Sequence, residues 1–229
     1  MKIPLDVRGE RLQLDYLKAE VMLREHAIQH TIVVFGSTRA RPGSRYYAIA
    51  RELGQRVARC TGVQGDGQMV VMTGGGPGIM EAANRGASET GAATVGLNIA
   101  LPENQSVNPY VPPDLCVEFH YFAIRKLHLL MRARALVVFP GGYGTFDELF
   151  EVLTLVQTAK IDPLPVVLVG EEYWRRAVDF EFMLAEGMIE ASDRQLFVYR
   201  ETAAEILDYI LAWHAQRGRP LACAAPNPA

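Results

Sequence analysis

Hydrophobic residues along the chain fall into short continuous runs separated by longer stretches of mixed polarity. The continuous runs predict buried strands, at residues 31–35, 69–72, 94–97, 116–119, 135–139 and 165–169. The stretches between and after them predict helices, at residues 46–60, 79–90, 121–134, 146–159, 173–186 and 202–216. Apolar strands that alternate with helices are typical of parallel sheets covered on both faces. We therefore predict an α/β fold, a three-layer sandwich around a mostly parallel sheet.

The two ends of the chain differ from this repeat. Residues 12–30 carry apolar side chains at helical spacing, so we predict a helical N-terminal extension over residues 1–30. An α/β domain is expected at 31–217, and the small, Pro-bearing tail 218–229 is expected to be disordered. Residues 61–67 are rich in turn formers and are predicted to form a surface loop.

Charge and cysteine content narrow the possible partners. The formal net charge is -3 and the pI is about 6.0, without the basic excess of a general nucleic-acid binder. A free mononucleotide needs only a local positive patch and remains possible. The three cysteines have neither a disulfide framework nor a zinc motif in their spacing, and they suit a reducing cytosol. With no membrane-length apolar run and no signal-peptide core at the N-terminus, we expect a cytoplasmic protein without a membrane partner.

Two glycine-rich segments follow predicted strands and open predicted helices. They are Thr73–Gly78 (Thr-Gly-Gly-Gly-Pro-Gly) and Pro140–Thr145 (Pro-Gly-Gly-Tyr-Gly-Thr). Glycines let the backbone approach an anion closely, and a helix N-terminus offers free N–H groups with partial positive charge. Both segments would also serve simply as tight turns. Because ligands bind beyond the carboxyl ends of parallel strands, two such loops at one edge favour a phosphate site.

The glycine spacing excludes the common dinucleotide and triphosphate motifs. A G-x-G-x-x-G pattern begun at Gly74 would place Ile79 at its third glycine, and one begun at Gly76 would place Glu81 there. No G-x-x-x-x-G-K-[ST] sequence occurs. A nucleoside monophosphate fits one compact anion site better than NAD or ATP does.

Glu148 is the sharpest candidate for chemistry, and it has two interpretations. Thr145 and Glu148 are spaced as a capping box, in which Thr145 caps the helix and Glu148 reaches back to it. Asp147 and Glu151 would then complement the helix dipole. Alternatively, Glu148 faces the phosphosugar, where a carboxylate can orient water or stabilise oxocarbenium charge.

The helix predicted at 121–134 carries a second group of candidates. Arg125 has a planar fork that suits phosphate or base, and Lys126 offers a point charge; the alternative is a solvated basic face. His120 and His128 lie in no triad or metal-ligand arrangement and are interpreted as structural.

Together these residues resemble a known family. Gly74–Ala83, Phe122–Lys126 and Pro140–Glu148 are similar to the Lonely Guy (LOG) family, whose members are cytokinin riboside 5′-monophosphate phosphoribohydrolases, often mislabelled as lysine decarboxylases. The resemblance covers about residues 30–210. The P-G-G-x-G-T-x-x-E motif is specific when it is paired with the upstream Arg-Lys.

The resemblance implies a Rossmann-like fold, a homodimer or larger homo-oligomer, and no metal or organic cofactor. It implies an N-glycosidase that hydrolyses AMP or an N6-modified AMP to free base and ribose 5-phosphate. Arg125 and Glu148 match the family's catalytic pair. The expected substrate-binding residues are Ser37, Arg39, Gly74, Gly75, Gly76, Gly78, Lys126, Gly141, Gly142, Tyr143, Gly144 and Thr145.

The chain departs from the family's pattern at one loop. Relatives often read Leu-Pro-x-Glu-Gln before Asn-Pro-Tyr, whereas here Asn104 stands at the glutamate position, with Glu103 before it. A lysine decarboxylase would need a Schiff-base lysine, and no lysine has a suitable context. The main alternative is a non-catalytic nucleotide-binding, regulatory or carrier module. The preferred base stays open.

Overall fold

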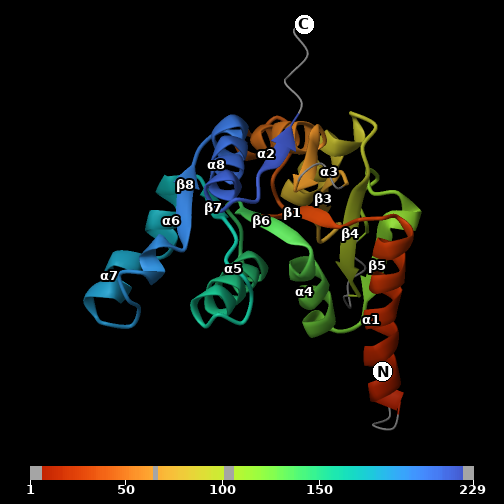
Figure 1. Cartoon of the computed structure of the whole chain (residues 1–229), viewed down its shortest axis with the longest axis horizontal. Helices are drawn as coiled ribbons and strands as arrows, with labels where there is room; N and C mark the ends of the chain where they lie inside the picture. Colours follow the sequence, from red (N-terminus) through yellow and green to blue (C-terminus); the bar gives the residue numbers. More distant parts are fainter. Residues whose placement is uncertain (1–6, 64–66, 101–105, 224–229) are drawn as a thin grey trace, which may run out of the picture.

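A computed structural model describes residues 7–63, 67–100 and 106–223. Its main sheet has seven parallel strands in the order β5-β4-β3-β1-β6-β7-β8 (Figure 1). The six predicted strands are confirmed, because continuous apolar runs can be buried only inside a covered sheet. The strands are β1 (His30–Phe35), β3 (Met69–Thr73), β4 (Thr94–Ile99), β5 (Cys116–Phe119), β6 (Ala133–Val138), β7 (Val166–Val169) and β8 (Phe197–Arg200).

Helices cover both faces of this sheet, as predicted (Figure 1). On β1, Val33 and Phe35 pack toward one face, while Ile32 and Val34 pack toward the other, as the two-residue repeat of a strand requires. The first face is covered by α1 (Arg8–Glu25), α4 (Phe122–Met131), α5 (Tyr143–Gln157), α6 (Glu171–Ala177) and α7 (Phe180–Ala185). The second is covered by α2 (Arg45–Val57), α3 (Ile79–Ser88) and α8 (Ala203–Gln216).

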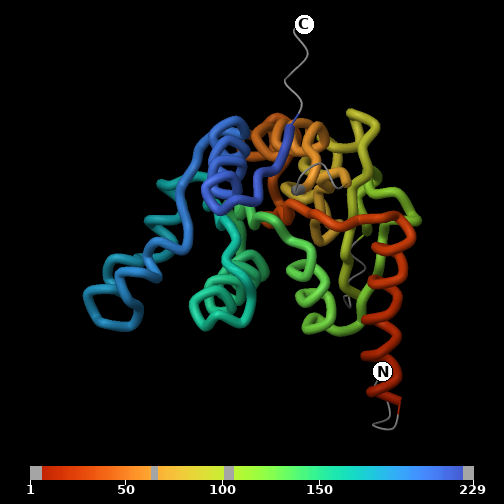
Figure 2. The backbone as a smooth tube through the Cα atoms, in the orientation of Figure 1, coloured from red at the N-terminus to blue at the C-terminus, as the bar shows by residue number. Residues whose placement is uncertain are grey.

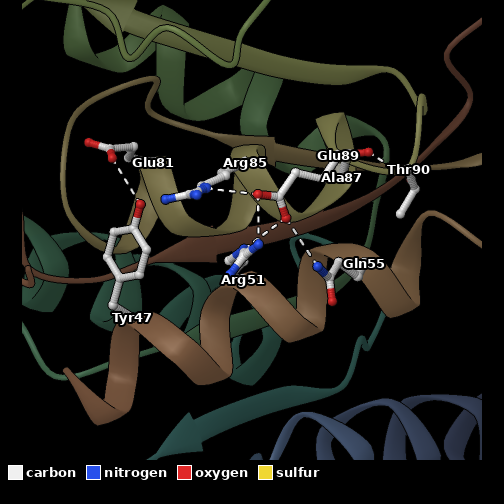
Figure 3. A network of polar contacts seen from close by, with 8 residues as sticks. All are labelled: Tyr47, Arg51, Gln55, Glu81, Arg85, Ala87, Glu89 and Thr90. Carbon is white, nitrogen blue, oxygen red and sulfur yellow. Dashed lines mark hydrogen bonds and ion pairs between the residues drawn. The ribbon is translucent and has the colours of Figure 1, made fainter. Parts of the chain in front are cut away.

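Helices α2 and α3 pack with their backbones in close contact. A Cβ on Gly54 would lie 2.2 Å from the Ala83 carbonyl oxygen, and one on Gly86 would lie 1.9 Å from that of Arg51. Glu89, the C-cap of α3, links the two helices by accepting hydrogen bonds from Arg51 and Gln55 of α2 and from Arg85 of α3 (Figure 3). The Arg51 guanidinium is the main reason that the pKa of Glu89 falls to about 2. This packing fixes α3, and with it the glycine segment that precedes α3.

Three expectations about the outer parts of the chain are wrong. Residues 61–63 belong to a strand, β2 (Cys60–Val63), rather than to a surface loop. It pairs antiparallel with β9 (Leu221–Cys223), so these tail residues are ordered. A Cys60–Cys223 disulfide joins the two strands across a sequence separation of 163. Long-range pairing of two short strands leaves no local pattern, and cysteine content no longer argues for a reducing compartment.

The remaining differences lie near the edge of the sheet. Strand β8 was not predicted, although its first three residues are apolar; only Phe197 of the strand is fully buried, as expected at the edge of the sheet. The helix predicted at 173–186 divides into α6 and α7, where the Asp179 side chain accepts from the Phe182 N–H and caps α7. Two short 3₁₀ turns occur at Pro113–Leu115 and Asp193–Gln195. Across the described ranges, no helix has the length and apolarity to span a bilayer.

Candidate active site

The candidate site lies where the chain reverses its direction of travel across the sheet. From β1 the chain first builds toward β3, and later returns to add β6 on the other side of β1. Such a switch point opens a crevice at the carboxyl ends of β1 and β6. A cavity of about 540 Å³ occupies it, lined by Phe35, Gly36, Ser37, Thr38, Arg39, Gly74, Met80, Asn98, Ile99, Phe122, Arg125, Gly142, Tyr143, Gly144, Thr145 and Glu148.

The backbone of Ser37 joins the three loops around this cavity. Its N–H donates to the Pro140 carbonyl at 2.9 Å, and its carbonyl accepts from the Ile79 N–H at 3.1 Å. The Ser37 hydroxyl accepts from the Arg39 N–H at 3.1 Å and shapes its own turn. The loops therefore meet at one edge of the sheet, as expected from their positions after parallel strands.

The N-terminus of α5 opens directly into the cavity. Gly142 is its N-cap and Tyr143 its first residue, and no side chain caps the helix. The N–H groups of Tyr143 and Gly144 are consequently available to an anion, whereas the Thr145 N–H already donates to the Gly142 carbonyl at 2.9 Å. Gly141 lies just behind, where a Cβ would stand 2.1 Å from the Thr145 hydroxyl, so only glycine fits. The Tyr173 hydroxyl donates to the Gly141 carbonyl at 2.5 Å and steadies the loop.

The glycine segment before α3 is used differently. Gly74 lines the cavity, whereas Gly75, Gly76 and Gly78 lie outside its lining. Gly78 has φ +73°, and a Cβ there would lie 2.3 Å from the Ser37 carbonyl oxygen. The Ile79 N–H is likewise engaged by that carbonyl. This segment therefore shapes the neighbouring loop, and the α5 N-terminus is the more open anion site.

Arg125 and Glu148 form a buried ion pair in the cavity wall. Arg125 projects from α4 and Glu148 from α5, with exposed fractions of 9% and 3%. The Arg125 Nη2 donates to Glu148 Oε1. Within the described ranges, Arg125 Nε is buried without a partner. An unpaired buried donor is costly, so this N–H is a group that a bound ligand or an ordered water would satisfy.

Burial governs the acidity of Glu148. Loss of solvent raises the pKa of Glu148 to about 6, although Arg125 and Lys126 both act to lower it. Near neutral pH the carboxylate is therefore mostly ionised but remains able to take up a proton. A group with these properties can stabilise positive charge or accept a proton from water.

The capping-box interpretation of Glu148 is wrong. Helix α5 begins before Thr145, so Thr145 lies inside its first turn and Gly142 occupies the cap. The expectation that Asp147 and Glu151 complement the helix dipole is wrong as well, because neither lies in the first turn of α5; they hold Lys126 Nζ at 2.8 and 3.2 Å. The pKa of Lys126 is lowered by burial but raised overall by Asp147, Glu148 and Glu151. Lys126 is thus held by carboxylates and does not line the cavity.

The two histidines contact the N-terminal helix α1 and do not line the cavity. Asp15 of α1 accepts from the backbone N–H of His120 at 2.7 Å and contacts its Nδ1 at 3.1 Å. The His128 ring packs 4.8 Å from the ring of Tyr16. Burial lowers the pKa of His128. These contacts attach α1 to the main domain and agree with a structural interpretation.

Two buried asparagines behind Gly74 were missed from the sequence. Asn84 of α3 and Asn108 hydrogen-bond to each other at 2.9 Å, and Asn108 also reaches the glycine segment. Asparagine within a helix or after a Pro-bearing loop gives no distinctive signal. Residues 101–105, including the Asn104 departure, lie outside the described residues.

Among the lining residues that the structure describes, the charged side chains are one carboxylate, Glu148, and two arginines, Arg39 and Arg125. No lysine is among them, so a Schiff base has no donor there. Across residues 7–63, 67–100 and 106–223, no three His, Cys, Asp or Glu residues gather as metal ligands.

Comparison with known proteins identifies the family of this chain. Residues 80–210 match the family described as possible lysine decarboxylase. The chain belongs to this family, which is the LOG family. A relative from Oryza sativa subsp. japonica, a probable cytokinin riboside 5′-monophosphate phosphoribohydrolase, is 28% identical over 182 residues, or 77% of this chain and 74% of the relative. The Rhodococcoides fascians enzyme of that name is 27% identical over 168 residues, 72% of this chain and 80% of its own.

Solved structures confirm the fold. The molybdenum cofactor binding protein of Rippkaea orientalis superposes with a TM-score of 0.54 and 20% identity, covering 80% of this chain and 94% of its own. At this identity the likeness concerns architecture, and the site must be argued from its own residues.

Proposed function

We propose that this LOG-family protein hydrolyses the N-glycosidic bond of a nucleoside 5′-monophosphate, releasing free base and ribose 5-phosphate. The observation that carries the proposal is the buried Arg125–Glu148 pair in the wall of a cavity that also contains an uncapped helix N-terminus. The names of the relatives support the same reaction class.

The 5′-phosphate would bind at the start of α5. Free N–H groups at Tyr143 and Gly144 and the helix dipole favour a dianion there. Ser37 and Arg39 line the adjoining wall and add a hydroxyl and a positive charge. Binding through the phosphate fixes the ribose relative to Glu148, which converts recognition energy into orientation of the reacting carbon.

Glu148 would stabilise the ribosyl cation and activate water. As the C1′–N bond breaks, its electron pair leaves with the base, and the water oxygen forms the new bond to C1′. One water proton stays on the new hydroxyl, and the other passes through Glu148 to the departing base. Arg125 holds Glu148 in place and directs its unpaired Nε–H toward the base or sugar.

The apolar part of the cavity lining would receive the base. Phe35, Met80, Ile99 and Phe122 supply apolar or aromatic surface. Phe122 also packs under the Arg125 guanidinium, with Cζ 5.1 Å from the ring centroid. Such a surface accepts a flat base, with or without an apolar N6 substituent. AMP and N6-modified AMP are therefore the first substrates to compare.

Self-association is part of the proposal. Helices α1 and α4 lie side by side at one edge of the sheet (Figure 2). They expose large apolar side chains, namely Leu14, Leu17, Val21, Phe122, Leu127 and Met131. Exposed apolar patches of this kind mark interaction surfaces. We expect a homodimer or larger homo-oligomer, which light scattering coupled to gel filtration would measure.

A panel of substrates tests the proposed reaction. Purified protein is incubated with AMP, N6-modified AMP and the matching nucleosides, and free base and ribose 5-phosphate are quantified. We expect products from the monophosphates and little from the nucleosides, since the helix N-terminus has no phosphate to hold in the latter. Binding of AMP without product would instead support a non-catalytic nucleotide-binding or carrier module.

A further inference from the structure

Asn108 contacts the glycine segment of the candidate site from outside the cavity. Its backbone N–H donates to the Gly75 carbonyl at 2.8 Å. Its side-chain Nδ2 lies 3.1 Å from both the Gly75 and Gly76 carbonyl oxygens. Its Oδ1 accepts from the Tyr110 N–H at 3.2 Å, which orders its own segment. One side chain thus ties the segment after β4 to the turn before α3.

The contact belongs to a continuous buried network. Asn84 Oδ1 accepts from Asn108 Nδ2 at 2.9 Å and from the Thr73 hydroxyl at 2.7 Å. The Thr73 hydroxyl in turn accepts from the Gly75 N–H at 2.9 Å. Asn84 Nδ2 donates to the Thr94 hydroxyl of β4 at 2.7 Å. All four side chains are buried, and networks satisfied in this way rigidify the groups that they join.

The network holds Gly74 on both sides. Gly74 lines the cavity, between Thr73 and the clamped Gly75, whose φ is +70°. A Cβ on Gly74 would lie 3.7 Å from Arg125 Nη1, so Gly74 borders the arginine of the buried pair. A shift of the turn would therefore change the wall against which Arg125 and a bound phosphosugar rest.

We infer that Asn108 is a positioning residue, which fixes the Gly74–Gly76 turn against Arg125 and so sets the affinity for the phosphosugar. The inference rests on the proposed function for its choice of ligand. Asn108 itself would not contact the reacting atoms, because it does not line the cavity. Its effect should fall mainly on KM and on binding of ribose 5-phosphate, with a smaller change in kcat.

Two substitutions separate this role from general stability. Asn108→Ala removes the donor and the acceptor, while Asn108→Asp keeps an acceptor for Tyr110 but places negative charge against the carbonyls. The control, Ile210→Ala, opens a buried cavity in α8 at a distance from the turn. We expect both Asn108 variants to lose about 10–100-fold in kcat/KM for AMP, since small misplacements of binding groups have effects of that size. The control should retain both kcat/KM and affinity for ribose 5-phosphate.

Hydrogen exchange of the wild-type protein gives a second measurement, which requires no folded variant. Ribose 5-phosphate should slow exchange of the Gly75 and Asn108 amides together. If the Asn108 variants match the control, or if ligand protects Gly75 but not Asn108, the positioning role is refuted. Wild-type protein that binds ribose 5-phosphate but does not cleave AMP would overturn the proposed hydrolysis alone. Should the wild type not bind ribose 5-phosphate, amide exchange at Gly75 still tests the contacts of Asn108 with the turn. Exchange at Gly75 that is no faster in Asn108→Asp than in the wild type would refute them.

Discussion

Replacing Glu148 with glutamine should stabilise the protein while it abolishes most of the activity. Glu148 is 3% exposed, and burial raises its pKa from 4.5 to about 6. Since a change of one in pKa corresponds to about 1.4 kcal/mol, ionising this side chain costs the folded state about 2 kcal/mol relative to the unfolded chain. Glutamine resembles the protonated form in shape and can still accept from Arg125, but it carries no charge to desolvate.

The sign of the effect with pH follows from the raised pKa. Below about pH 4.5 Glu148 is protonated in both states, so its neutral form causes no loss of stability. As pH rises toward and through 6 the folded state must bury a charge, and that contribution to stability is lost. We therefore expect Glu148→Gln and wild type to be similar near pH 4, and the variant to be more stable by up to about 2 kcal/mol at pH 7.

Urea denaturation at several pH values measures this difference. Glu205→Gln provides a control of opposite sign, because N–H donation from Glu201 and Thr202 lowers the pKa of Glu205 in its capping box. That variant should be less stable than wild type at pH 7, and the deficit should shrink as pH falls. If Glu148→Gln is instead destabilised at pH 7, attraction to Arg125 outweighs desolvation and the account of the site's acidity is wrong.

Activity should show the same ionisation. If the carboxylate is the working form, wild-type kcat/KM for AMP rises with pH through about 6 and then levels. Glu148→Gln should lower kcat about 10²–10⁴-fold, in the range of acid–base and electrostatic catalysis. A flat profile of kcat/KM between about pH 5 and about pH 7.5, a range that spans the expected midpoint, would contradict this role.

Three further substitutions test other parts of the structure. Arg125→Met should cut turnover and move the midpoint of the kcat/KM profile above 6, because Arg125 lowers the pKa of Glu148; an unmoved midpoint would contradict the pairing. Gly78→Ala should lower the free energy of unfolding by more than about 1 kcal/mol and impair AMP binding. The control Gly91→Ala, at φ +78° with open space around it, should affect stability only. Equal losses of AMP binding in the two variants would refute the role of the close contact between Gly78 and the Ser37 carbonyl. Without reductant, Cys223→Ser should lower the free energy of unfolding by about 2–5 kcal/mol and preserve kcat/KM. With reductant, the stability of the wild type should fall to that of the variant.

The parts of the fold that could be predicted are those with a strong local pattern. The apolar runs of β1 and β6 have no stable place except a covered sheet, so their burial and parallel pairing followed from the sequence. Strand β9 could not be found in this way, since its three residues depend on pairing with β2, on the disulfide and on burial of Leu221 in the core. Its partner is distant in the chain, and no periodicity records such a pairing.

The candidate site, too, could be predicted only where a local pattern exists. That the loops after β1, β3 and β6 share one edge follows from the parallel sheet. Glu148 could be singled out, but its freedom from a capping role depends on where α5 begins, and helix boundaries are not encoded sharply. Lys126 illustrates the limit for charges, because its carboxylate partners on the next helix decide its orientation. Asn108 was missed because it contacts main-chain carbonyl oxygens, which every residue possesses, so no pattern of side chains points to it.

The junction formed by Ser37 has a consequence for how this protein tolerates change. Its two links to the neighbouring loops use main-chain atoms, so almost any side chain could occupy the position and keep them. A conventional alanine scan would therefore test the Ser37 hydroxyl but leave both main-chain links in place. Proline, which lacks the amide hydrogen, or an ester bond in place of the peptide would uncouple the loops. Side-chain mutagenesis alone thus leaves this main-chain junction between the loops untested.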